Sequence, residues 1–129
     1  MDPRALIVKF NEHISNRDLD GLSALMADDH TFIDKGGHAI SGKSKCLEAW
    51  RGFFASFPDY RNVFHSLAVE DNRVVIVGRS SCSDIRLDGP ALWVASTGDD
   101  RLAEWRVYED TPANRRTLGI ASGGSSREP

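Results

Sequence analysis

The sequence predicts an α+β domain in which helices cover one face of a curved, mostly antiparallel sheet. Apolar residues recur at helical spacing before Pro58, and they alternate with a period of two from Tyr60 onward. Turn residues divide the later part into consecutive strands, and helices followed by such a strand meander are typical of the α+β class. A chain of 129 residues has room for one core and is too short for two.

Three helices are expected in the first half of the chain. The first begins at Asp2-Pro3, because a capping residue before a first-turn proline suits a helix start. The second follows Asp18, whose side chain can accept hydrogen bonds from the first amides of a helix. The third starts from Ser41 as its cap, runs to about Ser56 and carries an aromatic stripe.

The strands begin between the second and third helices. His30 to Ile33 can extend as a strand, and Gly36-Gly37 turns the chain so that His38 to Ile40 pairs back on it. Further strands are expected at residues 60–70, 73–83, 91–97 and 101–109.

Residues 1–111 form the expected single domain, and residues 112–129 form a polar tail. The tail is rich in Gly, Ser and Arg and has little to bury, so we expect it to be mobile or weakly docked.

Composition excludes several classes of partner. A formal net charge of -3 without a Lys/Arg run gives no footprint for nucleic acid. The apolar runs are far shorter than the roughly 20 residues that a membrane span needs, and the N-terminus lacks the apolar stretch of a signal peptide. We therefore expect a cytoplasmic protein with reduced thiols at Cys46 and Cys82, although their number alone also permits a disulfide.

The segment from Arg17 to Gly37 carries the clearest candidate for chemistry. A short helix and an acidic break lead to a strand that ends at Asp34. Because Phe32 and Ile33 precede it, this carboxyl group can have a raised pKa, which suits proton transfer. The alternative is a turn residue whose carboxylate binds backbone amides before the two glycines.

A sheet capped by helices leaves a cavity, and the aromatic content fits an apolar ligand pocket. Six aromatic residues are candidates to line it: Phe10, Trp50, Phe54, Phe57, Trp93 and Trp105. Core packing is the competing interpretation for each of them, since aromatic stripes at regular spacing are usually core.

The four histidines do not predict a metal site. His13, His30, His38 and His65 lack ligand spacing, and the cysteines form no CxxC pair, so neither a metal nor a cofactor is expected. His65 shares a predicted strand face with Val63, Leu67 and Val69. It is therefore either a proton donor that points into the cavity or a core histidine whose hydrogen bonds are satisfied.

The segment from Asp2 to Gly42 resembles the SnoaL-like and ketosteroid-isomerase-like proteins of the nuclear transport factor 2 superfamily. The likeness rests on the helix DLDGLSALMADD and the strand that ends at Asp34, and it continues more loosely to about Asp110. It implies a cone with three N-terminal helices on the concave face of the sheet, a homodimer, and Asp34 at the position of a catalytic base. The superfamily includes isomerases, cyclases, dehydratases, epoxide hydrolases and non-catalytic modules, so the likeness selects no single activity.

The complete site of ketosteroid isomerase does not carry over. That enzyme pairs its base with a tyrosine and a protonated aspartate. The resemblance places Phe10 at the tyrosine, and Pro90 or Ala91 near the acid. Loss of one such donor typically costs about 2.7–4 kcal/mol of transition-state stabilisation.

The epoxide hydrolase site is also incomplete. Those enzymes carry Arg-x-Asp on a middle strand and an aspartate on the final strand, where this chain has Arg79-Ser80-Ser81 and Val107. Arg79, Ser81 and Val107 remain candidate ligand contacts, and a solvated or ion-paired arginine is the alternative for Arg79.

The sequence therefore predicts binding of a small, largely apolar molecule, without a cofactor. With Asp34 as general base and His65 as proton donor, the protein would be an isomerase or cyclase. The alternative is a non-catalytic ligand-binding or dimerisation module with an incomplete site.

Overall fold

The computed structural model describes residues 2–120. In chain order, the elements are α1 (Pro3–Ser15), α2 (Leu19–Leu25), β1 (Met26–Ile33), β2 (Ala39–Ser41), α3 (Lys43–Ser56), β3 (Arg61–Glu70), β4 (Arg73–Ser81), β5 (Gly89–Gly98), β6 (Arg101–Glu109) and α4 (Pro112–Thr117).

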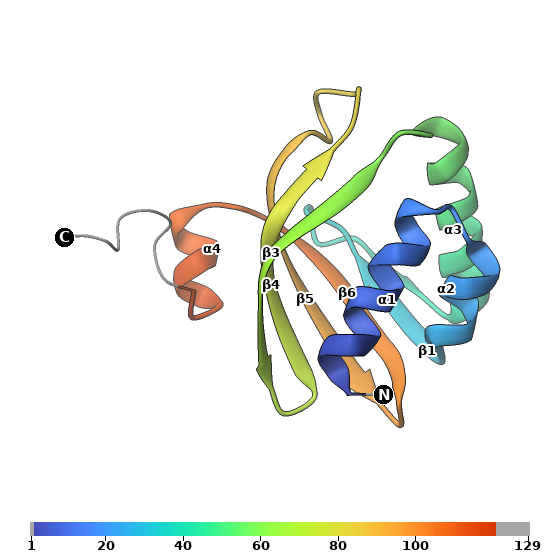
Figure 1. Cartoon of the computed structure of the whole chain (residues 1–129), viewed down its shortest axis with the longest axis horizontal. Coiled ribbons are helices and arrows are strands. Elements are labelled where there is room, and N and C mark those ends of the chain that lie inside the picture. The colour runs from blue at the N-terminus through green and yellow to red at the C-terminus, as the bar shows by residue number, and fades with distance from the viewer. Residues whose placement is uncertain (1, 121–129) are drawn as a thin grey trace.

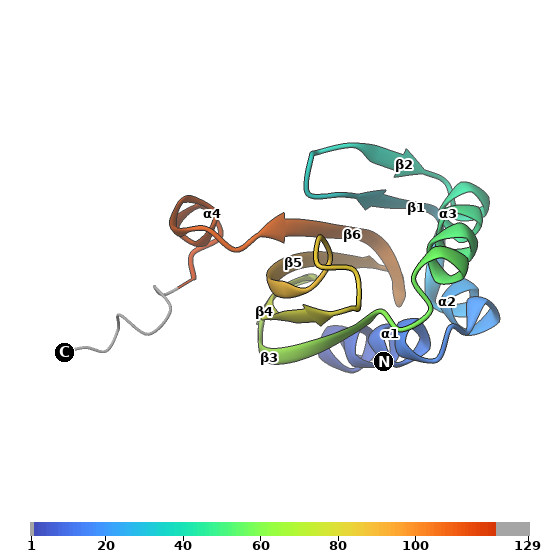
Figure 2. The same cartoon turned by 90° about the horizontal axis from the view of Figure 1, so that it is seen from above.

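One curved sheet holds all six strands, in the order β2-β1-β6-β5-β4-β3. Only the β1–β6 pair is parallel, and the other neighbours are antiparallel. Helices α1, α2 and α3 lie on one side of the sheet and α4 on the other (Figure 1). Figure 2 shows the sheet curling from β3 and β4 round to the β1–β2 hairpin, with α3 beside this hairpin. The predicted α+β cone is confirmed, with a fourth helix beyond the three expected.

Side-chain caps fix the starts of the first two helices. Asp2 accepts a hydrogen bond from the Ala5 amide at 2.8 Å, and Asp18 accepts one from the Gly21 amide at 2.9 Å. The third helix was expected to start from Ser41, but Ser41 ends β2, and Gly42 precedes the helix without a side-chain cap.

The main core fills the space between the three N-terminal helices and the concave face. Phe10 of α1 packs against Trp105 of β6 with ring centroids 5.0 Å apart, and Phe64 of β3 packs against Trp93 of β5 at 5.2 Å. Phe10 and Trp93 are fully buried. These contacts fix the helices over the sheet and leave the pocket nearer to α3.

Before its bulge, strand β3 turns the opposite face to the core from the one that the sequence predicted. A bulge between Phe64 and Ser66 inserts His65 as an extra residue, so Phe64 and Leu67 pack against the core. Val63, which was expected to face inward, pairs with Arg79 on the other face and is 47% exposed. Val69 lies opposite the buried Val74 on the core side, and it is 44% exposed near the end of this edge strand. A bulge reverses the alternation of side chains beyond it, and the apolar pattern alone does not reveal it.

The fourth helix belongs to the segment that was expected to be a polar, weakly docked tail. Thr111 caps α4 through its side chain. Leu118, directly after the helix, packs on the convex face of the sheet against Val75, Leu92 and Val94. The start of the tail thus forms a helix that packs on the domain, and residues 121–129 lie outside the described residues.

Candidate ligand-binding pocket

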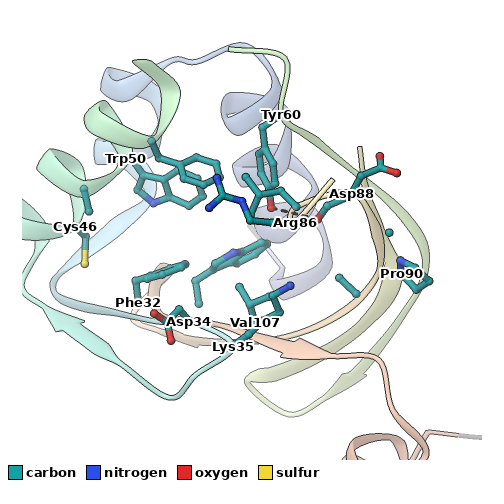
Figure 3. A pocket seen from close by; sticks show the side chains of 17 residues that line it. Phe32, Asp34, Lys35, Cys46, Trp50, Tyr60, Arg86, Asp88, Pro90 and Val107 are labelled. Carbon is teal, nitrogen blue, oxygen red and sulfur yellow. Dashed lines mark hydrogen bonds between the residues drawn. The ribbon is translucent and has the colours of Figure 1, made fainter. Parts of the chain in front are cut away.

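A cavity of about 330 Å³ opens between α3, the β1–β2 turn, the loop 82–88 and the concave face of the sheet (Figure 3). Its apolar wall comes from three elements: Phe32 of β1, Ala49, Trp50 and Phe53 of α3, and Trp105 and Val107 of β6. Its polar lining comprises Asp34, Lys35, Tyr60, Ser80, Arg86 and Asp88.

The aromatic wall is held by contacts between its own rings. Trp50 meets Phe32 edge-on at a centroid distance of 5.9 Å and Phe53 at 5.8 Å. Phe53 in turn meets Tyr60 edge-on at 4.7 Å. Such edge-to-face pairs are favourable beyond their buried area. The wall is therefore formed before any ligand arrives.

Asp34 lies at the edge of this pocket and also holds the β1–β2 turn. Its Oδ1 accepts hydrogen bonds from the backbone amides of Gly36 and His38 at 2.8 and 3.0 Å, and the His38 imidazole lies 3.3 Å away. The His38 amide contributes most to holding the pKa of Asp34 below its ordinary value, with further help from the Gly36 amide and the imidazole. The predicted rise in pKa is wrong, because amides of the turn stabilise the carboxylate and the side chain is only half-buried.

The two roles considered for Asp34 are compatible in this geometry. Its Oδ1 performs the turn role, whereas its Oδ2 has no hydrogen-bond partner within residues 2–120. The carboxylate is therefore ionised at neutral pH and has one oxygen available at the edge of the pocket.

A hydrogen-bonded chain of three polar side chains reaches the pocket from the β3–β4 end of the sheet. The Tyr60 hydroxyl lies 3.2 Å from Ser80 Oγ, and Ser80 Oγ donates to Asn62 Oδ1 at 2.8 Å. All three residues are buried. Burial raises the pKa of Tyr60 above its ordinary value, so its hydroxyl stays protonated at physiological pH.

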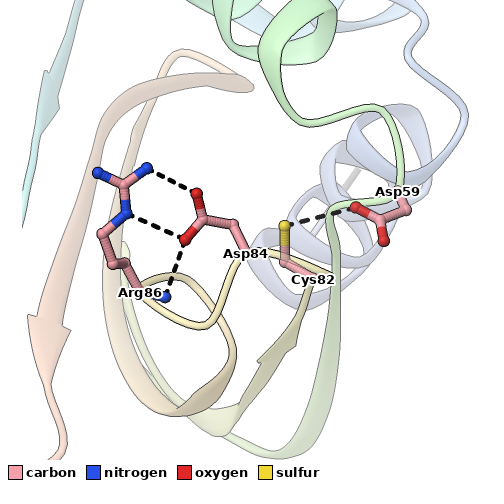
Figure 4. A network of polar contacts seen from close by, with 4 residues as sticks. All are labelled: Asp59, Cys82, Asp84 and Arg86. Carbon is pink, nitrogen blue, oxygen red and sulfur yellow. Dashed lines mark hydrogen bonds and ion pairs between the residues drawn. The ribbon is translucent and has the colours of Figure 1, made fainter.

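Carboxylates anchor the loop 82–88 that borders the pocket (Figure 4). Asp59 accepts hydrogen bonds from the Ser83 amide at 2.9 Å and from the Cys82 thiol at 3.5 Å. Within the loop, both side-chain oxygens of Asp84 bind the Arg86 guanidinium, which holds the pKa of Asp84 at about 2. The loop thereby places Arg86 in the lining of the pocket (Figure 3).

Four of the predicted site residues line this pocket: Asp34, Trp50, Trp105 and Val107. Three other predicted wall residues belong to the aromatic core instead. Phe10 and Trp93 are fully buried beneath the pocket wall, and Phe54 packs beside Trp50. Phe57 packs against Phe53 at 4.9 Å, behind the pocket lining.

The remaining predicted residues, Arg79, Ser81 and His65, do not reach the pocket. Arg79 is exposed and pairs with Asp88 at 3.1 Å, which is the ion-paired alternative considered for it. Side chains alternate along a strand, and Ser80 lines the pocket, so its neighbours Arg79 and Ser81 lie on the other face. His65 is exposed at the β3 bulge and cannot serve as a proton donor in the cavity.

Several lining residues were not predicted as site residues, chiefly Tyr60, Ser80, Phe32, Phe53 and Arg86. A signal for Ser80 was present in the sequence. Val74 and Ile76 face the core, and continued alternation along β4 brings Gly78 and then Ser80 to the same face. The position of Arg86 depends on the conformation of a loop, which no periodicity specifies.

Within residues 2–120, no group of three or more His, Cys, Asp or Glu side chains could hold a metal ion. No helix in the described part of the chain is long and apolar enough to cross a membrane.

Residues 7–110 match the model of the SnoaL-like domain, so the chain belongs to this family. The resemblance identified from the sequence is thereby confirmed. No curated protein matches the chain.

Solved structures share the fold at low sequence identity. A proposed polyketide cyclase from Sinorhizobium meliloti is similar with a TM-score of 0.73 and 17% identity, covering 80% of this chain and 93% of its own. IdmH, a proposed polyketide cyclase from Streptomyces antibioticus, has a TM-score of 0.72 and 18% identity, covering 93% of this chain and 100% of its own. An epoxide hydrolase of the LEH-like type from M. tuberculosis has a TM-score of 0.71 and 18% identity, covering 90% of this chain and 86% of its own.

Proposed function

We propose that this protein binds a small, largely apolar molecule in the pocket between α3 and the concave face of the sheet. The observation that carries the proposal is the aromatic wall of Phe32, Trp50, Phe53 and Trp105 around a cavity of about 330 Å³. Ligand pockets typically have volumes of about 300–1,000 Å³ and mostly apolar walls with a few polar groups. Flat ring systems suit such a wall, because they stack on or pack edge-on against aromatic side chains.

Tryptophan fluorescence provides the test. Trp50 lines the pocket, whereas Trp93 is fully buried in the core and does not. Titration with steroids and aromatic polyketides should quench fluorescence saturably in the wild type and in Trp93→Phe, and the signal should shrink in Trp50→Phe. An absence of saturable binding across the panel would contradict the proposal.

A second candidate function is cofactor-independent proton transfer, as in an isomerase or cyclase. It is favoured by one observation, namely that the ionised carboxylate of Asp34 lines the same pocket with Oδ2 unpaired in the described structure. A lowered pKa makes this carboxylate a weak base, and Phe10 provides no donor for an enolate oxygen. We therefore propose binding as the principal function and place proton transfer second.

The substitution Asp34→Asn separates the two functions, because it removes the base and nearly preserves its shape. Proton exchange on a bound ketone, followed by deuterium incorporation, should fall at least about 100-fold in Asp34→Asn if Asp34 is the base. Asp20→Asn, at an exposed position of α2, is the matched control and should leave the rate unchanged. Equal rates in wild type and Asp34→Asn would leave Asp34 with the turn role alone.

A further inference from the structure

We propose that the Tyr60 hydroxyl is the hydrogen-bonding contact of the pocket for an oxygen atom of the ligand, either a hydroxyl or a carbonyl. This inference rests on the proposed function and specifies its ligand class as an apolar ring molecule with one such oxygen. It assigns Tyr60 a binding role that differs from the proton transfer considered for Asp34.

The local structure directs Tyr60 into the pocket. Pro58 follows the end of α3, and the Tyr60 amide donates to the Phe57 carbonyl at 3.2 Å, which closes a tight turn before β3. The Tyr60 ring packs edge-on against Phe53, and the residue is 8% exposed. Figure 3 shows the hydroxyl directed into the cavity, between the aromatic wall and the edge that carries Asp88.

The hydrogen bonds among Tyr60, Ser80 and Asn62 leave the Tyr60 hydroxyl able to form a further hydrogen bond. Ser80 has a single proton, which it donates to Asn62 at 2.8 Å, so Ser80 can only accept from Tyr60. The Tyr60–Ser80 separation of 3.2 Å is long beside the usual distance of about 2.7–2.8 Å for two hydroxyl oxygens. A hydroxyl offers one donor and two acceptor sites. The Asn62 side chain also hydrogen-bonds the Tyr60 hydroxyl and opposes the rise in its pKa. One of the two acceptor sites of Tyr60 is therefore left without a partner within residues 2–120.

Three charged groups of the lining already have protein partners, whereas Trp50 Nε1 is buried and has no hydrogen-bond partner within residues 2–120. Asp34 uses Oδ1 for its turn, Asp88 binds Arg79 and the Cys82 amide, and Arg86 binds Asp84. These three groups are charged and lie near the solvent-exposed edge of the pocket, where water competes for them. Tyr60 is a neutral, buried group, and a hydrogen bond to a ligand is more effective where water is excluded.

Both kinds of ligand oxygen have a defined partner in this arrangement. A ligand hydroxyl donates to the Tyr60 oxygen and extends the chain in one direction, from ligand to Tyr60, Ser80 and Asn62. A ligand carbonyl accepts a hydrogen bond from the Tyr60 hydroxyl, which then no longer donates to Ser80. A hydroxyl ligand keeps every hydrogen bond among Tyr60, Ser80 and Asn62, whereas a carbonyl ligand replaces the long Tyr60–Ser80 hydrogen bond.

Matched ligand pairs test the inference. We suggest 2-naphthol against 2-methylnaphthalene, and 2-acetylnaphthalene against 2-isopropenylnaphthalene, because each pair differs by one oxygen at nearly constant shape. Affinities come from chemical-shift titrations of the full chain. The wild type should prefer the oxygenated member of at least one pair by about 3- to 10-fold, the range for one net hydrogen bond.

Two tyrosine variants supply the comparison. Tyr60→Phe keeps the ring and should bind both members of each pair equally. Tyr108→Phe, on β6 and stacked with Arg106 away from the pocket lining, should keep the wild-type preference. If Tyr60→Phe retains the preference for the oxygenated ligand, Tyr60 is not the hydrogen-bonding contact. The same holds if the wild type binds the hydrocarbons and shows no preference, and in both cases the pocket still binds ligands. If none of the four ligands binds, the proposed function itself fails.

A serine variant tests the same inference without changing the ring. Ser80→Ala removes the protein acceptor of the Tyr60 proton. It should strengthen the preference for 2-acetylnaphthalene and weaken that for 2-naphthol. Unchanged preferences in Ser80→Ala would overturn the role assigned to the hydrogen bonds among Tyr60, Ser80 and Asn62.

Discussion

The substitution Gly78→Ala tests the account of the β3 bulge. Gly78 of β4 faces the bulge, and a Cβ atom built on it would lie 2.0 Å from the Val63 carbonyl oxygen and 3.0 Å from the Phe64 Cα. Both neighbours are backbone atoms of a paired strand, so the two strands must move apart. Overpacking of this kind costs about 1–3 kcal/mol. We expect a loss of about 2 kcal/mol or more, because relief of the clash also displaces Phe64 from Trp93.

Urea denaturation followed by circular dichroism measures this loss. With a denaturant slope of about 2 kcal/mol/M, the midpoint should fall by roughly 1 M. Gly52→Ala is the matched control, because a Cβ at Gly52 meets no atom within 4 Å. Since Gly52 lies in the exposed interior of α3, this change should raise stability by up to about 1 kcal/mol. A Gly78→Ala variant as stable as the wild type would refute the proposed steric requirement.

Three further predictions concern pH, the fourth helix and assembly. Burial lowers the pKa of His30, whose Nδ1 lies 2.8 Å from the Leu102 carbonyl oxygen. As the pH falls, the imidazole therefore binds a proton in the unfolded chain before it does so in the folded protein. Stability should therefore fall as pH drops below about 6.5, and His30→Gln should reduce this dependence in denaturation at pH 7 and pH 5; equal slopes would contradict the assignment. Leu118→Ala should cost about 2 kcal/mol in urea denaturation, because Leu118 covers Val75, Leu92 and Val94; an unchanged midpoint would show that α4 adds no stability. Light scattering should give about twice the 14.3 kDa chain mass if the predicted homodimer forms, and a monomer at high micromolar concentration would exclude it.

Periodicity and capping predicted the fold because both depend on neighbouring residues. Asp2 and Asp18 cap the helices that the sequence assigned to them, and the change of period at Pro58 marks the end of α3. The fourth helix escaped prediction although Thr111-Pro112 offers a cap before a first-turn proline, as Asp2-Pro3 does. The segment has few apolar residues, and the two that pack on the sheet, Leu118 and Ile120, follow the helix.

The pocket was harder to predict, because its lining depends on which face of each strand turns inward. On β4, the likeness to the epoxide hydrolase motif favours Arg79 and Ser81 as ligand contacts. The alternation of side chains from Val74 places Ser80 inward instead. On β3, the bulge removed His65 from the inner face. Asp34 was located correctly at the end of an apolar strand. The direction of its pKa shift was not predicted, because the amides that lower the pKa belong to a turn whose geometry the sequence does not specify.

Filling the cavity beside α3 tests most directly whether an apolar molecule binds there. Ala49 and Ala55 are both exposed positions of α3, and Ala49 lines the cavity whereas Ala55 lies outside its lining. Dissociation constants of the best flat ligand should be measured for Ala49→Phe and Ala55→Phe. We predict that Ala49→Phe weakens binding at least about 10-fold, since the added ring occupies ligand space, and that Ala55→Phe matches the wild type. Equal affinities in the two variants would place the ligand elsewhere and contradict the account.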